Sequence, residues 1–161
     1  EIRLLRKLQK GTPKDFEIFC GDILSALGGT KNIVGGSYDG GIDFWSTDIL
    51  LNGMTYPSTL GSRVVVVGQA KRYADGNHVS EVDLRAFVGA SVRRLGELKR
   101  TKSEFIGLLQ PAVLAFWITS DFHSNAKRFA QEMGIWYLNG IALCQLAISL
   151  GFDENYEANH A

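Results

Sequence analysis

A small set of polar side chains in this sequence could hold a divalent cation and act on a phosphate ester. Asp43 follows a Gly-Gly turn at the start of one strand. Gln69 and Lys71 end a second strand, predicted from the β-branched run Val64–Val67. The two-residue period of a strand places Gln69 and Lys71 on one face and turns Ala70 to the other. If the strands pair, a carboxylate, an amide oxygen and an ammonium group meet at one sheet edge, where they could bind a hard cation and offset phosphate charge.

The first predicted helix lies upstream of these residues. It begins with Thr12 as a cap, Pro13 at the first helical position and Asp15 in a capping-box pattern. An apolar stripe at three- and four-residue spacings then continues to Leu27. Glu17 lies on the flank of that stripe, so its carboxylate is either solvated or leans over the sheet edge that carries the polar set.

The remaining elements build a sheet around the two site strands. The pair Asn52-Gly53 is typical of a tight hairpin turn, and the first strands are predicted to form an antiparallel meander on the first helix. A strand at 112–119, a helix at 124–133 and a strand at 135–138 follow, and such a unit favours a right-handed parallel crossover. The prediction is an α/β fold of three layers, α/β/α, around a central mixed β-sheet.

Length and composition indicate one globular domain. With 161 residues, of which 45% are hydrophobic and 21% charged, the chain resembles neither a disordered segment nor a membrane protein. It begins at Glu1 without an initiator Met or a signal-peptide pattern, which indicates a piece of a longer protein. We predict a linker or helix end at 1–11, the domain at 12–151 and a polar tail at 152–161. Because the formal net charge is zero, any binding of a polyanion would depend on local basic clusters.

The cysteine and histidine positions do not suggest a zinc site. Cys20 and Cys144 each sit in an apolar helical pattern, which indicates buried free thiols in a reducing compartment and hence a cytoplasmic protein. His78, His123 and His160 lack the spacing of zinc ligands and are predicted to lie at the surface.

An ordered set of motifs runs through nearly the whole chain. It comprises Thr12-Pro-x-x-Phe-Glu17, Asp39-Gly-Gly-Ile-Asp43, Gln69-Ala-Lys71-Arg-Tyr73, Phe87-Val-Gly-Ala90, Ile118-Thr-Ser-x-Phe122 and Leu138-Asn-Gly140. From Thr12 to about Leu150 the sequence resembles the catalytic domain of the Mrr-like restriction endonucleases, as a Gln-x-Lys variant within the PD-(D/E)XK nuclease superfamily. The resemblance implies a restriction-endonuclease-like fold.

The resemblance also implies a metal-dependent DNA endonuclease that hydrolyses phosphodiester bonds, as the cleavage module of a restriction or defence protein. Asp43, Gln69 and Lys71 would be catalytic, with a supporting role for Glu17. Mg²⁺, or Mn²⁺ in its place, would bind Asp43, the Gln69 side-chain oxygen and the backbone carbonyl of Ala70. One compact site cuts one phosphodiester at a time. Cleavage of double-stranded DNA would therefore need a homodimer or higher oligomer, and other domains of a longer parent protein would direct it.

Basic residues near the predicted site are candidate phosphate contacts. They comprise Lys71, Arg72, Arg93 and Arg94. These cations would flank the site and could contact phosphates, although any one such cluster is more often a solvated face. Two other functions stay open. One is a non-catalytic nucleic-acid-binding or assembly module that keeps the nuclease fold, and the other is a nuclease that resolves DNA junctions.

Overall fold

The computed structural model describes residues 1–34, 41–50, 63–74 and 76–159 of the chain. In chain order its elements are α1 (Ile2–Lys10), α2 (Pro13–Ala26), β1 (Asn32–Ile33), β2 (Phe44–Leu50), β3 (Arg63–Lys71), β4 (His78–Val79), α3 (Glu81–Thr101), β5 (Ala112–Ile118), β6 (Asp121–Phe122), α4 (Ser124–Met133), β7 (Trp136–Leu138) and α5 (Gly140–Ser149). The predicted hairpin turn at Asn52-Gly53 and the first residues of the Asp39-Gly-Gly motif lie outside the described residues.

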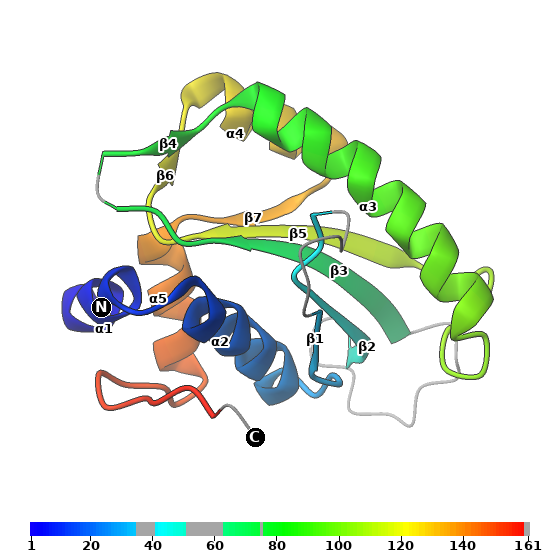
Figure 1. Cartoon of the computed structure of the whole chain (residues 1–161), viewed down its shortest axis with the longest axis horizontal. Coiled ribbons are helices and arrows are strands. Elements are labelled where there is room, and N and C mark those ends of the chain that lie inside the picture. Colours follow the sequence, from blue (N-terminus) through cyan, green and yellow to red (C-terminus); the bar gives the residue numbers. More distant parts are fainter. Residues whose placement is uncertain (35–40, 51–62, 75, 160–161) are drawn as a thin grey trace.

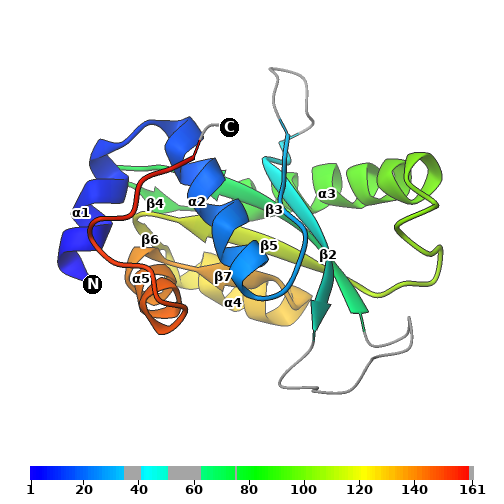
Figure 2. The same ribbon diagram turned by 90° about the horizontal axis from the view of Figure 1, so that it is seen from below.

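The main sheet is mixed and has the strand order β1-β2-β3-β5-β7. The strands β1, β2 and β3 pair antiparallel, and β3, β5 and β7 pair parallel. Figure 1 shows α3 and α4 on one face of the sheet, with α1, α2 and α5 on the other. Figure 2 views the molecule from the side of α1, α2 and α5. The predicted three-layer α/β/α fold, its antiparallel meander and its parallel β5–α4–β7 unit are confirmed.

The helix α2 begins as the sequence predicts. The Thr12 side chain accepts a hydrogen bond from the Asp15 backbone N–H at 3.1 Å, and the Asp15 carboxylate accepts one from the Thr12 N–H at 2.8 Å. Such caps typically stabilise a helix by about 1 kcal/mol. At the other end, Gly28 has a φ of +89°, a conformation that lets the chain leave the helix and turn toward β1.

The helix α3 also begins with a capping box, formed by Ser80 and Asp83. Its buried residues are Leu84, Phe87, Ser91 and Leu98. Val82 and Val92 are 73% and 61% exposed and therefore lie off this buried face. Leu84, Phe87 and Leu98 pack against the sheet and α4.

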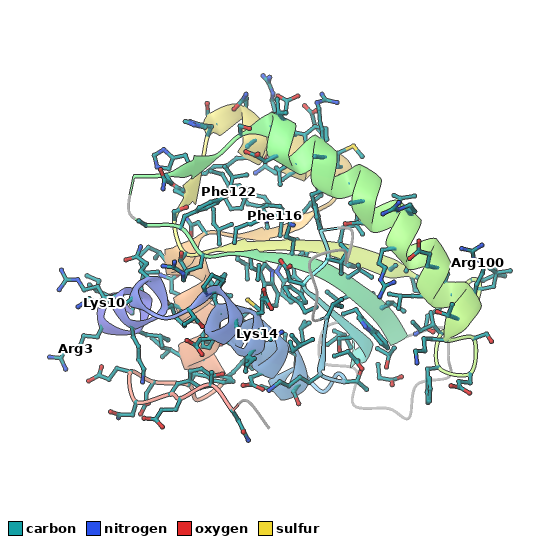
Figure 3. All side chains as sticks on the ribbon, viewed as in Figure 1. Arg3, Lys10, Lys14, Arg100, Phe116 and Phe122 are labelled. Carbon is teal, nitrogen blue, oxygen red and sulfur yellow. The ribbon has the colours of Figure 1, made fainter. Side chains whose placement is uncertain are left out.

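Two hydrophobic clusters lie on opposite faces of the main sheet. Phe19, Phe44 and Trp117 belong to the cluster that also includes residues of α1, α2 and α5. Phe116 and Phe122 belong to the cluster that includes residues of α3 and α4, and both are labelled on that side of the sheet in Figure 3. The strand β3 contributes alternate residues to the two clusters, as expected for a central strand covered on both faces.

The segments before and after the predicted domain also pack on this fold. Leu4 and Leu8 of α1 are 1% and 6% exposed, and Phe152 and Tyr156 pack against the same cluster. The Tyr156 hydroxyl donates a hydrogen bond to the Asp22 carboxylate at 2.6 Å. The domain limits at 12–151 remain a prediction. Residues before position 12 and after position 151 also contact the core. Within the described part of the chain, every helix is too short or too polar to cross a membrane.

Candidate active site

The strand β3 carries Gln69 and Lys71 to the edge of the sheet. Its valines at 64–67 are at most 2% exposed, which anchors the strand in the core. Gly68 follows, and any side chain there would overlap the ring of Phe44, which packs across the strand at this point. Gln69 is 8% exposed and Lys71 is half-buried. Both line the α3 side of the sheet, whereas Ala70 belongs to the cluster on the α2 side.

Asp43 reaches β3 just where its pairing with β2 ends. Phe44 pairs with Gly68 in the antiparallel ladder, and the Asp43 N–H donates to the Gly68 carbonyl at 2.9 Å. The Asp43 carboxylate then takes the place of a further strand residue, because its Oδ2 accepts a hydrogen bond from the Ala70 N–H at 2.8 Å. The carboxylate is thus fixed against the backbone between Gln69 and Lys71.

The Ala70 carbonyl faces the same edge as Asp43. In an extended strand the N–H and C=O of one residue point to the same side, and the Ala70 N–H points to Asp43. The Asp43 carboxylate, the Ala70 carbonyl and the Gln69 amide form a set of hard oxygen donors of the kind that Mg²⁺ accepts. Within the described ranges, no group of three or more His, Cys, Asp and Glu residues could hold a metal. Of these three donors, only the Asp43 carboxylate carries a charge.

Glu17 lies on the α2 side of the site. Its carboxylate pairs with the Lys14 ammonium at 3.1 Å, and its side chain is 20% exposed. Burial raises the pKa of the Cys20 thiol well above its ordinary value, and the negative charges of Asp43 and then Glu17 raise it further.

A cavity of about 310 Å³ opens between β3 and α3. It is lined in part by Gly41, Gln69, Lys71, Tyr73, Asp83 and Ala90. Sequence reasoning placed Gln69 and Lys71 here but missed Tyr73 and Asp83. The period of β3 could have revealed Tyr73, which lies two residues beyond Lys71. Asp83 also forms the capping box of α3 with Ser80, and that role gives no sign of a position in the cavity.

A hydrogen-bond network holds the end of β3. The Thr119 N–H donates to the Lys71 carbonyl at 3.2 Å, and the Thr119 hydroxyl bonds both the N–H and the carbonyl of Tyr73 at 2.8 Å. The Gln9 side chain donates to the Thr119 carbonyl at 2.9 Å, while Arg72 Nη1 donates to the Gln9 carbonyl at 2.7 Å. The backbone on either side of the Lys71 side chain is therefore tied to β5 and α1.

The predicted DNA-binding residues lie in different surroundings. Lys71 faces the cavity, and Arg93 is exposed on α3. Arg94 donates to Glu97 at 3.1 Å, and Arg72 lies against α1. Three of the four cations thus lie on β3 or α3, and Arg72 is turned toward the N-terminal helix.

The cysteine and histidine side chains lie away from this cavity or outside the described chain. Cys20 and Cys144 are free and buried, as predicted, and burial raises the pKa of Cys144 to about 11. His78 and His123 are exposed, and their rings meet edge to face with centroids 5.2 Å apart. His160 lies outside the described residues.

Comparison with known proteins identifies similar sequences and folds. A family model described as restriction endonuclease, for the Mrr catalytic domain, matches residues 8–147. The structure of the MspJI restriction endonuclease in complex with a 27-mer oligonucleotide is 22% identical, with a TM-score of 0.58, and the match covers 89% of this chain and 30% of that one. The DNA modification-dependent restriction endonuclease AspBHI is 18% identical, with a TM-score of 0.59, and the match covers 94% of this chain and 35% of that one. The chain thus spans about a third of the length of these proteins. Among curated proteins no match was found.

Proposed function

Because the chain belongs to the Mrr-like restriction endonuclease family, we propose that it is a Mg²⁺-dependent endodeoxyribonuclease domain that hydrolyses phosphodiester bonds of double-stranded DNA. The proposal makes it the cleavage module of a restriction or defence protein. The observation that carries it is the position of the Asp43 carboxylate. This carboxylate accepts a hydrogen bond from the Ala70 N–H, between Gln69 and Lys71, whose side chains line the cavity.

The residues of this edge have separate tasks in the proposed reaction. Asp43, the Gln69 side-chain oxygen and the Ala70 carbonyl hold Mg²⁺, or Mn²⁺ in its place. The cation supplies Lewis acidity and a water of lowered pKa. The Lys71 ammonium orients the attacking water and offsets charge that develops on the phosphate. Glu17, on α2, assists as a second carboxylate.

Contacts to DNA beyond the cleaved phosphate would come from the basic residues. Lys71 and Arg93 present their cations to the cavity and to solvent, respectively. Arg72 and Arg94 each bond one protein partner, and a guanidinium with five donors keeps others for phosphate oxygens. Other domains of a longer protein would select the DNA site. Two free, buried cysteines support the proposal that this protein acts in the cytoplasm.

Plasmid cleavage tests the proposal directly. The full-length parent protein is incubated with modified and unmodified plasmid, in Mg²⁺ and in EDTA, beside its Lys71→Ala variant. We expect nicked and linear DNA in Mg²⁺ alone, and a rate at least about 100-fold lower for Lys71→Ala with DNA binding kept within a few-fold. Cleavage that persists in EDTA, or that is equally fast in the variant, would contradict the proposed function. Equal losses of binding and cleavage would make Lys71 a plain phosphate contact.

A further inference from the structure

The cavity beside the candidate active site is lined by a further polar side chain, Tyr73, just beyond the end of β3. Gln69, Lys71 and Tyr73 all line it, at successive two-residue steps along the chain. We propose that Tyr73 is a substrate contact whose hydroxyl donates a hydrogen bond to a DNA phosphate next to the one that is cleaved. This inference rests on the proposed nuclease function and assigns that site a second phosphate position.

The backbone of Tyr73 is held in place although β3 has ended. Its N–H donates to the Thr119 hydroxyl at 2.8 Å, and its carbonyl accepts from the same hydroxyl at 2.8 Å. Thr119 is itself fully buried. Thr119 therefore fixes the backbone of Tyr73 beyond the end of β3. Because the Thr119 N–H also donates a hydrogen bond to the Lys71 carbonyl, the position of Tyr73 is fixed relative to Lys71. Such fixed geometry is what a substrate-positioning side chain requires.

The Tyr73 ring is partly buried, but its hydroxyl remains available. The ring packs against the cluster that contains Phe87 and Phe116, and the label of Phe116 in Figure 3 marks this side of the sheet. The hydroxyl has no hydrogen-bond partner within the part of the chain that the structure describes. Because the ring is packed into protein, the free polar end is the part that can meet a ligand.

The Tyr73 hydroxyl is a hydrogen-bond donor at neutral pH, as an ordinary tyrosine phenol is. Burial raises the pKa of Tyr73, and the charge of Asp83 raises it further. The Asp83 carboxylate accepts hydrogen bonds from the N–H and hydroxyl of Ser80, at 2.9 and 2.7 Å. It also lies at the N-terminus of α3, where the helix dipole compensates a negative charge. Asp83 therefore favours the donor form of Tyr73 while its own charge is largely balanced.

The spacing along the chain favours a different phosphate for Tyr73 from the one that Lys71 contacts. Residues two apart can be separated by at most about 7 Å of backbone, and successive phosphates of one DNA strand have a comparable separation. With Lys71 at the cleaved phosphate, the Tyr73 hydroxyl lies one phosphate further along. The neutral Tyr73 hydroxyl suits this position beside the Lys71 ammonium group. It would hold the DNA strand by the neighbouring phosphate and leave the phosphate that is cleaved to Lys71.

Duplexes with one neutral methylphosphonate at either phosphate that flanks the cut can test this contact. The full-length protein is compared with Tyr73→Phe, which keeps the ring, and with Tyr137→Phe, which removes a hydroxyl that bonds Gln131 elsewhere on the surface. For the wild type we expect about tenfold slower single-turnover cleavage when one of the two flanking phosphates is neutral. Tyr73→Phe should be about tenfold slower on unmodified DNA and lose most of that penalty. Tyr137→Phe should behave as the wild type.

The outcomes separate this inference from the proposed function. A wild type that cuts no duplex in Mg²⁺ would overturn the nuclease proposal itself. A wild type that cuts, together with a Tyr73→Phe variant that is equally fast, or that keeps the full methylphosphonate penalty at both positions, would overturn the Tyr73 contact alone.

Discussion

At Gln69 the chain presents a neutral amide beside the Asp43 carboxylate, where a glutamate would add a second negative charge. Gln69→Glu should therefore lower the Mg²⁺ concentration that gives half-maximal cleavage, whereas Asp43→Asn should reduce cleavage to background at any practical Mg²⁺ concentration. A Mg²⁺ titration of cleavage rates for the wild type and both variants measures this, with thermal melts to confirm folding. A folded Gln69→Glu that is inactive, with an Asp43→Asn that still cuts, would show that the proposed ligands are wrong.

Residue types and the period of a strand were enough to predict one side of the site. Gln69 and Lys71 share a face because they are two apart, and the structure places both in the cavity. The alignment of Asp43 could not be predicted, because it depends on the register between β2 and β3. That register shifts between Ser46 and Ile49, where Asp48 has a φ of +66°. Local propensity does not indicate such an irregularity.

Gly68 controls how closely β2 and β3 approach the site. Gly68→Ala should destabilise the fold by about 1–3 kcal/mol, because the new methyl group would overlap the Phe44 ring. The clash also lies next to the Asp43 pairing, so we expect cleavage to fall more than stability alone explains.

Gly96→Ala is the matched control for this prediction. A methyl group there meets nothing within 4 Å, on an exposed face of α3, and should stabilise the protein by about 0.5–1 kcal/mol. Urea unfolding of both variants measures the two changes. A Gly68→Ala protein as stable and as active as Gly96→Ala would contradict the packing argument.

Elements with local signals were predictable, and elements fixed by tertiary contacts were not. The capping boxes at Thr12 and Ser80 and the left-handed Gly134 after α4 follow from neighbouring residues. The strands β4 and β6 have two residues each, too few for any pattern, and they form because His78 and Val79 meet the chain after β5. The burial of α1 likewise depends on contacts with distant parts of the chain.

At the scale of the molecule, one copy of this fold offers one candidate site for one strand of DNA. We expect scission of both strands to require two copies, so nicked circles should accumulate at low protein concentration. Linear product should then rise more than proportionally with concentration. The measurement is a time course of supercoiled plasmid cleavage over a range of protein concentrations. A linear product yield proportional to concentration from the lowest value would indicate cutting by a single copy.

The neutral amide of Gln69 affects how tightly the protein binds DNA when no cation occupies the site. Asp43 and Lys71 carry opposite charges, and a neutral Gln69 adds no further negative charge to a cavity that Asp83 also lines. A second carboxylate at position 69 would add to the repulsion of a polyanion when no cation is bound. Gln69→Glu should bind about tenfold more weakly in EDTA, whereas Gln131→Glu on the exposed surface of α4 should change little. Association measured by fluorescence anisotropy would contradict this if Gln69→Glu and Gln131→Glu bound equally. Under the proposed function, DNA binding by the wild type would then not require a bound cation.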